Sequence, residues 1–169
     1  MLPKELESQV MALHSGSFSW ALRCCGGDRS EAEDVLQSTY VKILEGRARY
    51  RAEASLKTWL YSVIRRTAAD RQRRHARRER ILGWLGRTPA APSPTPEGEL
   101  ERQREREVLK RARRELTPRQ SEIVDLVFDH ELTLSESAAV LGISVGSART
   151  HYDRAKKQLR RTLGEDRDE

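Results

Sequence analysis

The sequence of 169 residues has few of the residues that build a large core or a covalent framework. Aromatic residues make up 5% of the chain and hydrophobic residues 37%, whereas charged residues reach 34%. Such a composition favours small helical bundles whose outer faces carry charge over one large core. The two cysteines, Cys24 and Cys25, are neighbours, which excludes the disulfide framework of a secreted domain. The pair is interpreted as small, buried or half-buried helix residues, with a redox or metal role as the alternative.

Other absences narrow the function classes. No apolar run approaches 18 residues and no signal peptide is present, so we expect a cytoplasmic protein without membrane insertion. The sequence also lacks a His/Cys metal spacing, a phosphate-binding glycine loop and a cluster of carboxylates. These patterns support metal, nucleotide and hydrolytic chemistry. We therefore expect no metal, no cofactor and no catalytic residue, and hence a protein that is not an enzyme.

Charge is present but segregated along the chain. The formal net charge is +6, which points to an acidic partner, nucleic acid first. Residues 1–45 carry a net charge of −3, residues 65–80 carry +6, and residues 133–163 carry +4. One acidic segment therefore precedes two basic ones, and we expect two kinds of partner surface.

Proline is concentrated in one stretch. Four of the six prolines fall between Pro89 and Pro96, a composition that favours an extended linker. The sequence therefore predicts two domains, residues 1–86 and 99–169, joined by a proline-rich linker at 87–98.

Helical spacing dominates the N-terminal domain. Ser30–Glu33 has the pattern of a capping box, and the helix that follows is expected to end near Gly46. The next helix is expected after a polar loop at 47–55, with Ser55 as its cap. The expected buried positions are Leu36, Thr39, Tyr40, Ile43 and Leu44 on the first helix, and Leu56, Leu60, Val63, Ile64 and Thr67 on the second.

The C-terminal domain shows three successive helix-start signals. Thr117–Gln120 combines a cap, a proline at the first helical position and a capping glutamine. Thr133–Glu136 is a further capping box whose helix stops at Gly142, and Ser144 caps the last helix. The expected inward positions are Ile123, Val124, Val127 and Phe128, then Val145, Ala148, Tyr152, Ala155 and Leu159. No segment shows strand alternation, so the predicted fold class is all-α.

The last two predicted helices form a helix-turn-helix. The face opposite the core carries Arg149, Thr150, Asp153, Arg154 and Lys157. Arginines and a threonine near a helix N-terminus can reach guanine edges and phosphates in a major groove. The alternative is a solvated basic helix on an ordinary bundle.

Two faces of the N-terminal domain suggest different partners. Asp34, Gln37 and Val41 share a face outside the core stripe, with Glu33 beside it, which suggests docking to a basic protein. A solvated acidic face is the alternative.

The next helix carries Trp59, Ser62, Arg66 and Arg73 along one side, with Arg65 nearby. Aromatic rings stack on unpaired bases while arginines hold the backbone of a single strand. Trp59 could instead belong to the core, and the basic run 71–78 could be a solvated helix end rather than a phosphate contact.

Two sets of motifs carry a resemblance to a known family. The first set is Ala32–Gln37, Tyr50–Ser55, Thr58–Tyr61 and Ala68–Asp70, and the second is Leu116–Gln120, Leu141–Ser144 and Arg154–Leu159. The first set resembles σ region 2 and the second resembles σ region 4 of the extracytoplasmic-function (ECF) σ factors of bacterial RNA polymerase. Together they span about 15–80 and 104–163, in the family's order. The resemblance implies an alternative σ factor that directs promoter-specific initiation by core RNA polymerase.

The resemblance also implies residue roles. It implies that four residues bind the clamp helices of the polymerase β′ subunit: Glu33, Asp34, Gln37 and Val41. It places these at the −10 promoter element, where the loop 50–55 holds a base turned out of the strand: Tyr50, Arg51, Ser55, Trp59, Ser62, Arg65, Arg66 and Arg73. It places these at the −35 element: Arg119, Ser147, Arg149, Thr150, Arg154 and Lys157.

Further partners follow from the same resemblance. The C-terminal domain would touch the β flap, the linker would run toward the RNA exit path, and an anti-σ factor would hold the protein inactive. Three positions depart from the family pattern: Ser38 replaces an acid, Arg66 stands where asparagine is expected, and Asp153 lies on the groove-facing helix. The competing functions are a free-standing helix-turn-helix regulator of duplex DNA and, third, a nucleic-acid enzyme.

Overall fold

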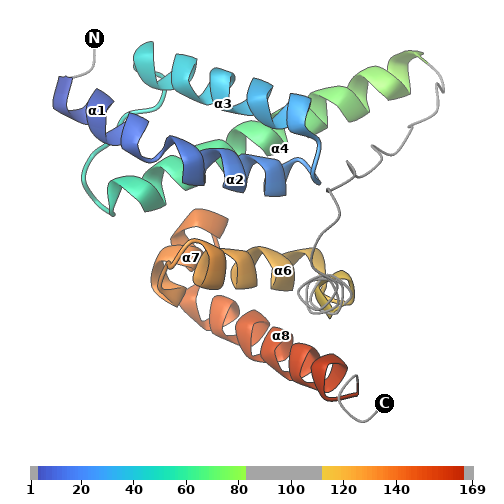
Figure 1. The fold of residues 1–169 in the computed structure, drawn as a ribbon. Helices are drawn as coiled ribbons and strands as arrows, with labels where there is room; N and C mark the ends of the chain where they lie inside the picture. Colours follow the sequence, from blue (N-terminus) through green and yellow to red (C-terminus); the bar gives the residue numbers. More distant parts are fainter. Residues whose placement is uncertain (1–3, 83–111, 166–169) are drawn as a thin grey trace, which may run out of the picture. The chain divides into compact units, whose positions relative to one another are not determined.

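The computed structural model describes residues 4–82 and 112–165, and every regular element in these ranges is a helix (Figure 1). In chain order the elements are α1 (Lys4–Ala12), α2 (His14–Cys24), α3 (Arg29–Leu44), α4 (Leu56–Leu82), α6 (Pro118–Val124), the π-helical turn η1 (Asp125–Asp129), α7 (Leu134–Leu141) and α8 (Val145–Glu165). The all-α prediction is confirmed. The predicted linker at 87–98 lies outside the described residues, so the domain boundaries stay predictions.

The chain forms two compact units, one built from α1–α4 and the other largely from α6, η1, α7 and α8. In the first unit, α2, α3 and α4 pack against one another in pairs. At the centre, the rings of Trp20 and Tyr61 stack with centroids 6.0 Å apart. Trp20 Nε1 donates a hydrogen bond to the Tyr61 carbonyl, 3.1 Å away. This bond satisfies a polar group that burial would otherwise leave without a partner.

Most of the predicted core stripe of the first unit is confirmed. Leu36, Thr39 and Ile43 of α3 are buried, as are Leu60, Val63, Ile64 and Thr67 of α4. Three positions differ: Tyr40 and Leu56 are half-buried, and Leu44 is 56% exposed. Leu44 is the last residue of α3, where the helix ends before another element can cover it.

The first turn of α3 corrects a prediction. The cap is Asp28 rather than Ser30, because the Asp28 carboxylate accepts a hydrogen bond from the Glu31 amide at 3.0 Å. Ser30 therefore lies inside the helix. At the other end Gly46 has a φ of +71°, so the predicted stop near Gly46 is confirmed.

The second unit begins as predicted. The Thr117 hydroxyl accepts from the Gln120 amide, the Gln120 side chain accepts from the Thr117 amide at 2.9 Å, and Pro118 opens α6. Leu116, Val124 and Ala155 form a buried cluster on which Leu159 packs. In this unit α6 packs against both α8 and η1.

The turn η1 explains a wrong prediction about Phe128. The predicted stripe placed Phe128 inward, but its side chain is 57% exposed and Leu126 is buried instead. The His130 amide donates to the Asp125 carbonyl, five residues earlier. A π-helical turn adds a residue per turn and rotates the following side chains off the α-helical stripe.

The helix-turn-helix is confirmed. The Glu136 amide donates to the Thr133 hydroxyl at 3.2 Å, and the Thr133 amide donates to the Glu136 carboxylate at 2.9 Å. Gly142 ends α7 with a φ of +64°. The Ser144 hydroxyl then accepts from the Ser147 amide at 3.1 Å and caps α8.

The inward face of α8 is confirmed at Ala148 and Ala155, which are fully buried. Tyr152 and Leu159 are half-buried. Val145 is a wrong prediction, since it is 43% exposed. It is the first residue of α8, and its side chain leans toward the preceding turn rather than over the core.

Candidate docking and nucleic-acid surfaces

The outer face of α3 is an acidic, accessible surface. Glu33, Asp34, Gln37 and Val41 are all exposed, and Val41 is 44% exposed despite its apolar side chain. Spacings of three and four residues place Asp34, Gln37 and Val41 on one helix face. We call these four residues the α3 docking face.

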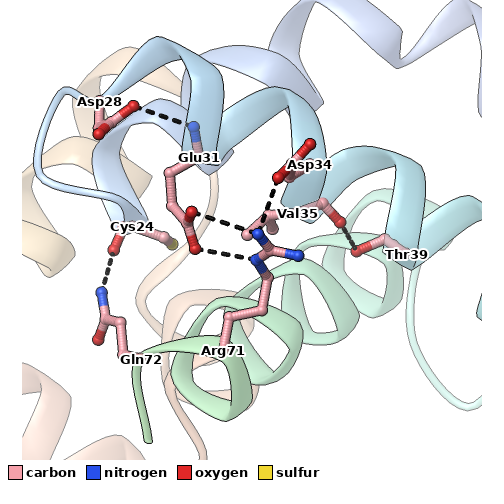
Figure 2. A network of polar contacts seen from close by, with 8 residues as sticks. All are labelled: Cys24, Asp28, Glu31, Asp34, Val35, Thr39, Arg71 and Gln72. Atoms are coloured by element: carbon pink, nitrogen blue, oxygen red, sulfur yellow. Dashed lines mark hydrogen bonds and ion pairs between the residues drawn. The ribbon is translucent and has the colours of Figure 1, made fainter. Parts of the chain in front are cut away.

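A polar network ties this face to α4 (Figure 2). Arg71 Nε and Nη2 donate to the two carboxylate oxygens of Glu31 at 2.9 and 3.3 Å. Its Nη2 also donates to Asp34 at 2.8 Å. Arg71 and Glu31 are about 70% buried at their side chains, with 30% and 27% exposed. The planar guanidinium therefore holds the Asp34 carboxylate in one orientation.

The same network sets the ionisation of its acid. The hydrogen bond from Arg71 lowers the pKa of the Glu31 carboxyl below its ordinary value. The Glu31 carboxylate in turn raises the pKa of Arg71, so both groups stay charged at neutral pH.

A second set of contacts joins α3 to α4 further along the helices. Lys42 Nζ donates to the Thr67 hydroxyl at 3.0 Å and lies 3.7 Å from the Asp70 carboxylate. Arg73 Nη2 donates to Asp70 at 2.6 Å, and this bond lowers the pKa of the Asp70 carboxyl. Arg73 is therefore anchored to Asp70 of the same helix, although its side chain is 75% exposed.

The loop before α4 is a built structure. The Tyr50 hydroxyl donates to the Ala54 carbonyl at 2.8 Å, and Ala52 has a φ of +57°. The Tyr50 ring lies 5.3 Å from the Trp59 ring, centroid to centroid. The Ser55 hydroxyl accepts from the Thr58 amide at 3.2 Å and caps α4, as predicted.

A cationic hollow of about 480 Å³ lies beside this loop. Its walls combine the apolar surface of Trp59 and Val63 with the side chains of Lys42, Arg47, Arg49, Arg51 and Arg66 and with the acid Asp70. Trp59 is half-buried, so it is not a core residue of the kind that Trp20 is. Arg66 is exposed, and Arg65 is half-buried.

The predicted groove-facing side of α8 is accessible. Gly146, Arg149, Thr150, Arg154 and Lys157 are all exposed, as is Ser147. The Thr150 hydroxyl donates to the Gly146 carbonyl at 3.0 Å.

Two further residues of this unit are engaged in pairs. Arg119 is half-buried and donates to Glu122 at 2.9 Å. The Asp153 carboxylate lies 3.6 Å from Lys156 Nζ, so the acid on this helix forms an ion pair with a neighbouring lysine.

Sequence reasoning missed the part of the site contributed by α2. A hollow of about 570 Å³ between α2 and α3 is lined by His14, Phe18 and Tyr40 together with Glu33 and Gln37 of the docking face. The His14 imidazole and the Tyr40 hydroxyl lie 3.0 Å apart. The helical spacing could have predicted part of this hollow, because Tyr40 follows Gln37 by three residues on the same helix. The contribution of α2 needed the tertiary packing.

Across residues 4–82 and 112–165, no group of three or more metal-ligating side chains gathers. In the same ranges, no helix combines the length and apolarity needed to cross a membrane. Cys24 and Cys25 are half-buried and form no disulfide. Cys24 is the last residue of α2, and Cys25 follows it.

The two units coincide with two parts of one protein family. Sigma-70 region 2 matches residues 10–78 and Sigma-70 region 4 matches residues 114–161. Together these matches cover more than half of the chain, so the protein belongs to the sigma-70 family of RNA polymerase σ factors. It is an ECF-type σ factor, and σ factors direct RNA polymerase to promoters and start transcription there.

Relatives with known names agree. The chain is 32% identical to the RNA polymerase sigma factor CarQ of Myxococcus xanthus, over 79% of this chain and 75% of that protein. It is 31% identical to the ECF RNA polymerase sigma factor SigX of Bacillus subtilis, over 80% and 72%. It is 28% identical to the RNA polymerase sigma factor YlaC of the same species, over 82% and 80%.

Solved structures show the same fold. The σ factor RpoE of Bartonella quintana, solved with the anti-σ factor NepR, aligns with a TM-score of 0.74 at 21% identity. This alignment covers 96% of the present chain and 98% of RpoE. CnrH, solved with the cytosolic domain of CnrY, aligns with a TM-score of 0.60 at 22% identity, covering 94% and 88%.

Proposed function

We propose that the α3 docking face binds the clamp helices of the β′ subunit of core RNA polymerase. The support is an exposed acidic face on a protein whose net charge is +6, together with the exposed apolar side chain of Val41 at its end. Acidic rims steer a basic partner, and an apolar group supplies contact area. Arg71 orients Asp34 for this contact.

The cationic hollow and the adjacent face of α4 take the −10 element as a single strand. One observation carries this proposal: Trp59 lines an arginine-rich hollow, and the Tyr50 ring lies beside it, 5.3 Å away between centroids and tilted by 51°. We call these two rings the aromatic platform. Aromatic rings stack on a base at about 1–3 kcal/mol each, while the arginines hold the phosphates. Arg51, Ser55, Ser62, Arg65, Arg66 and Arg73 complete this surface.

The exposed face of α8 reads the −35 element in duplex DNA. Arg149, Thr150 and Arg154 face the bases, and Lys157, Arg119 and Ser147 face the phosphates. The β flap contacts the same unit, and an anti-σ protein is the proposed regulator, as for the relatives crystallised with partners. The protein has no catalytic activity of its own and acts in the cytoplasm, where RNA polymerase acts.

Reconstitution with core enzyme tests the proposal. The full chain mixed with σ-free core polymerase is expected to initiate transcripts from a subset of a genome-derived promoter library, mapped by their 5′ ends. The absence of any initiation would contradict it. A free-standing helix-turn-helix regulator would instead shift a specific duplex in a gel without core enzyme.

A charge placed on the docking face tests that assignment separately. Val41→Arg is expected to weaken core binding at least tenfold, because it sets a cation where a basic partner docks. The matched control is Met11→Arg, which adds the same charge at an apolar side chain of α1 that is 60% exposed. Equal core affinity of the two variants would contradict the docking proposal.

A further inference from the structure

We propose that Arg66 makes this σ factor select a guanine among the unpaired bases of the −10 element. The inference rests on the proposed −10 surface and adds a base identity to it. Arg66 is exposed, and its guanidinium donates two hydrogen bonds to Ser62 of the same helix.

Arg66 is held in place by its own helix. Its Nε donates to the Ser62 carbonyl at 3.2 Å, and its Nη2 donates to the Ser62 hydroxyl at 3.2 Å. The Ser62 hydroxyl in turn donates to the Trp59 carbonyl at 2.7 Å. Three residues of one helix face are thus linked in a chain that ends at the aromatic platform.

This arrangement brings the guanidinium close to the platform. Residues 59 and 66 are two helical turns apart, about 10 Å along the axis. Because the side chain of Arg66 reaches back to Ser62, its head lies about one turn from Trp59. A base stacked on Trp59 therefore leaves its neighbour in the strand within reach of Arg66.

The donors that remain define which base fits. A guanidinium has five N–H groups in a planar fork. The bonds to Ser62 use Nε–H and one N–H of Nη2, so the parallel N–H pair of Nη1 and Nη2 points away from the helix. Two parallel donors match the O6 and N7 acceptors of guanine, the commonest specific contact of arginine with a base. Adenine and thymine lack such a pair on one edge. An unpaired cytosine presents O2 and N3 on its Watson–Crick edge, so a preference for cytosine in place of guanine would overturn the inference.

The surroundings favour recognition over a simple phosphate contact. Arg66 lines the same hollow as Lys42, Arg47, Arg49 and Arg51. Lys42 and Arg47 are paired with Asp70 and Glu45, whereas Arg49 and Arg51 can neutralise the backbone. The ordered side chain also loses little rotamer freedom on binding. Arg66 is thus a specificity-determining residue, and the other cations act on any sequence.

The test uses the reconstituted holoenzyme and pre-melted promoter fragments. Each position of the unpaired −10 strand is set in turn to G, A, C or T, and fragment affinity and transcript yield are measured. The wild type is expected to prefer guanine at one position by about tenfold. Replacing that guanine with 7-deazaguanine, which lacks the N7 acceptor, should remove most of this preference.

Variants of Arg66 separate the fork from the charge. Arg66→Lys keeps the charge but loses the planar fork of donors, so the preference for guanine should fall to about twofold. The preference that remains should not change when 7-deazaguanine replaces guanine. Arg66→Asn should also lose the preference for guanine. The control is Arg74→Lys, an exposed arginine on the same helix, which should leave the order of the four bases unchanged.

The outcomes distinguish this inference from the proposed function. A holoenzyme that initiates well but ranks the four bases equally at every unpaired position overturns the inference alone. So does an Arg66→Lys variant that keeps the tenfold preference. A chain that never initiates with core enzyme overturns the proposed function itself.

Discussion

Gly16 lies in the third position of α2, where its lack of a side chain is required by packing rather than by backbone conformation. A Cβ at this position would lie 2.5 Å from the Tyr61 hydroxyl. Tyr61 is fully buried against Trp20, so the ring cannot move aside without disturbing the core.

Gly16→Ala is therefore expected to destabilise the first unit by about 1–3 kcal/mol, the usual cost of overpacking. In an uncrowded helix the same change stabilises by up to about 1 kcal/mol, so the sign is diagnostic. Urea unfolding followed by tryptophan fluorescence measures it, because Trp20 and Trp59 report on the first unit. The control is Gly164→Ala in α8, where nothing lies within 4 Å of the added atom. Because α8 belongs to the second unit, unfolding of this variant is followed by far-ultraviolet circular dichroism.

The Cys25 thiol offers a second prediction for a single residue. Burial, together with the nearby carboxylates of Glu31 and Asp28, raises its pKa to about 11. The thiolate is the reactive form. In a Cys24→Ser variant at pH 8, iodoacetamide should therefore modify Cys25 about a hundredfold more slowly than free cysteine. The labelling rate should rise about tenfold per pH unit up to pH 10, and urea should abolish the protection. Fast labelling of the folded protein at pH 8 would contradict this.

At the scale of helices, the features that could be predicted from the sequence are those that depend on residues close together in the chain. The caps at Ser55, Thr117, Thr133 and Ser144 were predicted because a cap and its amide are two or three residues apart. The same locality produced the error at Ser30, since Asp28 offers an equivalent cap two residues earlier.

The misses depend on contacts distant in sequence. The π-helical turn that exposes Phe128 is not encoded in the apolar spacing. Arg71 reaches Glu31 across 40 residues, and the hollow between α2 and α3 required knowing how the helices pack. The accessible faces of α3 and α8 were predictable, because helical periodicity alone separates the core side from the other side.

The contact between Arg71 and Glu31 has a pH signature. The folded-state pKa of Glu31 lies below its unfolded value, so the contact stabilises the fold above the unfolded pKa near 4.5. This stability is lost as the pH falls through the lower, folded-state pKa. Arg71→Met should lower the free energy of unfolding at pH 7 by about 1 kcal/mol, the upper end for partly exposed ion pairs.

Comparison of unfolding between pH 3 and pH 7 checks this. The Arg71→Met variant should lose less stability on acidification than the wild type, so that the two converge at pH 3. Arg77→Met removes the same charge from an exposed position of α4 and should follow the wild-type curve. Parallel curves for wild type and Arg71→Met would show that the network does not set the pH dependence.

For the whole molecule, the two basic segments bind DNA in two forms, single-stranded and duplex. Residues 65–80 face a single strand and residues 133–163 face a duplex in the proposed function. Their charges of +6 and +4 both favour phosphate contact, which carries no sequence information. Specificity must therefore come from the few side chains whose donors point at bases rather than phosphates.

Arg149 and Lys157 on α8 separate these two contributions. In the holoenzyme, Arg149→Ala should weaken binding to the cognate −35 element by about 1–3 kcal/mol and leave binding to a scrambled element nearly unchanged, because it reads a base edge. Lys157→Ala should weaken both complexes about equally and reduce the slope of log affinity against log salt by about 1, as expected for one lost phosphate contact. Filter binding at 50 to 200 mM salt gives both quantities.

If Arg149→Ala lowers cognate and scrambled binding to the same extent, the arginine contacts phosphate and the assignment of the α8 face must be reversed. If the wild type binds both elements equally, the second unit does not read sequence at all, and promoter choice rests on the −10 surface alone.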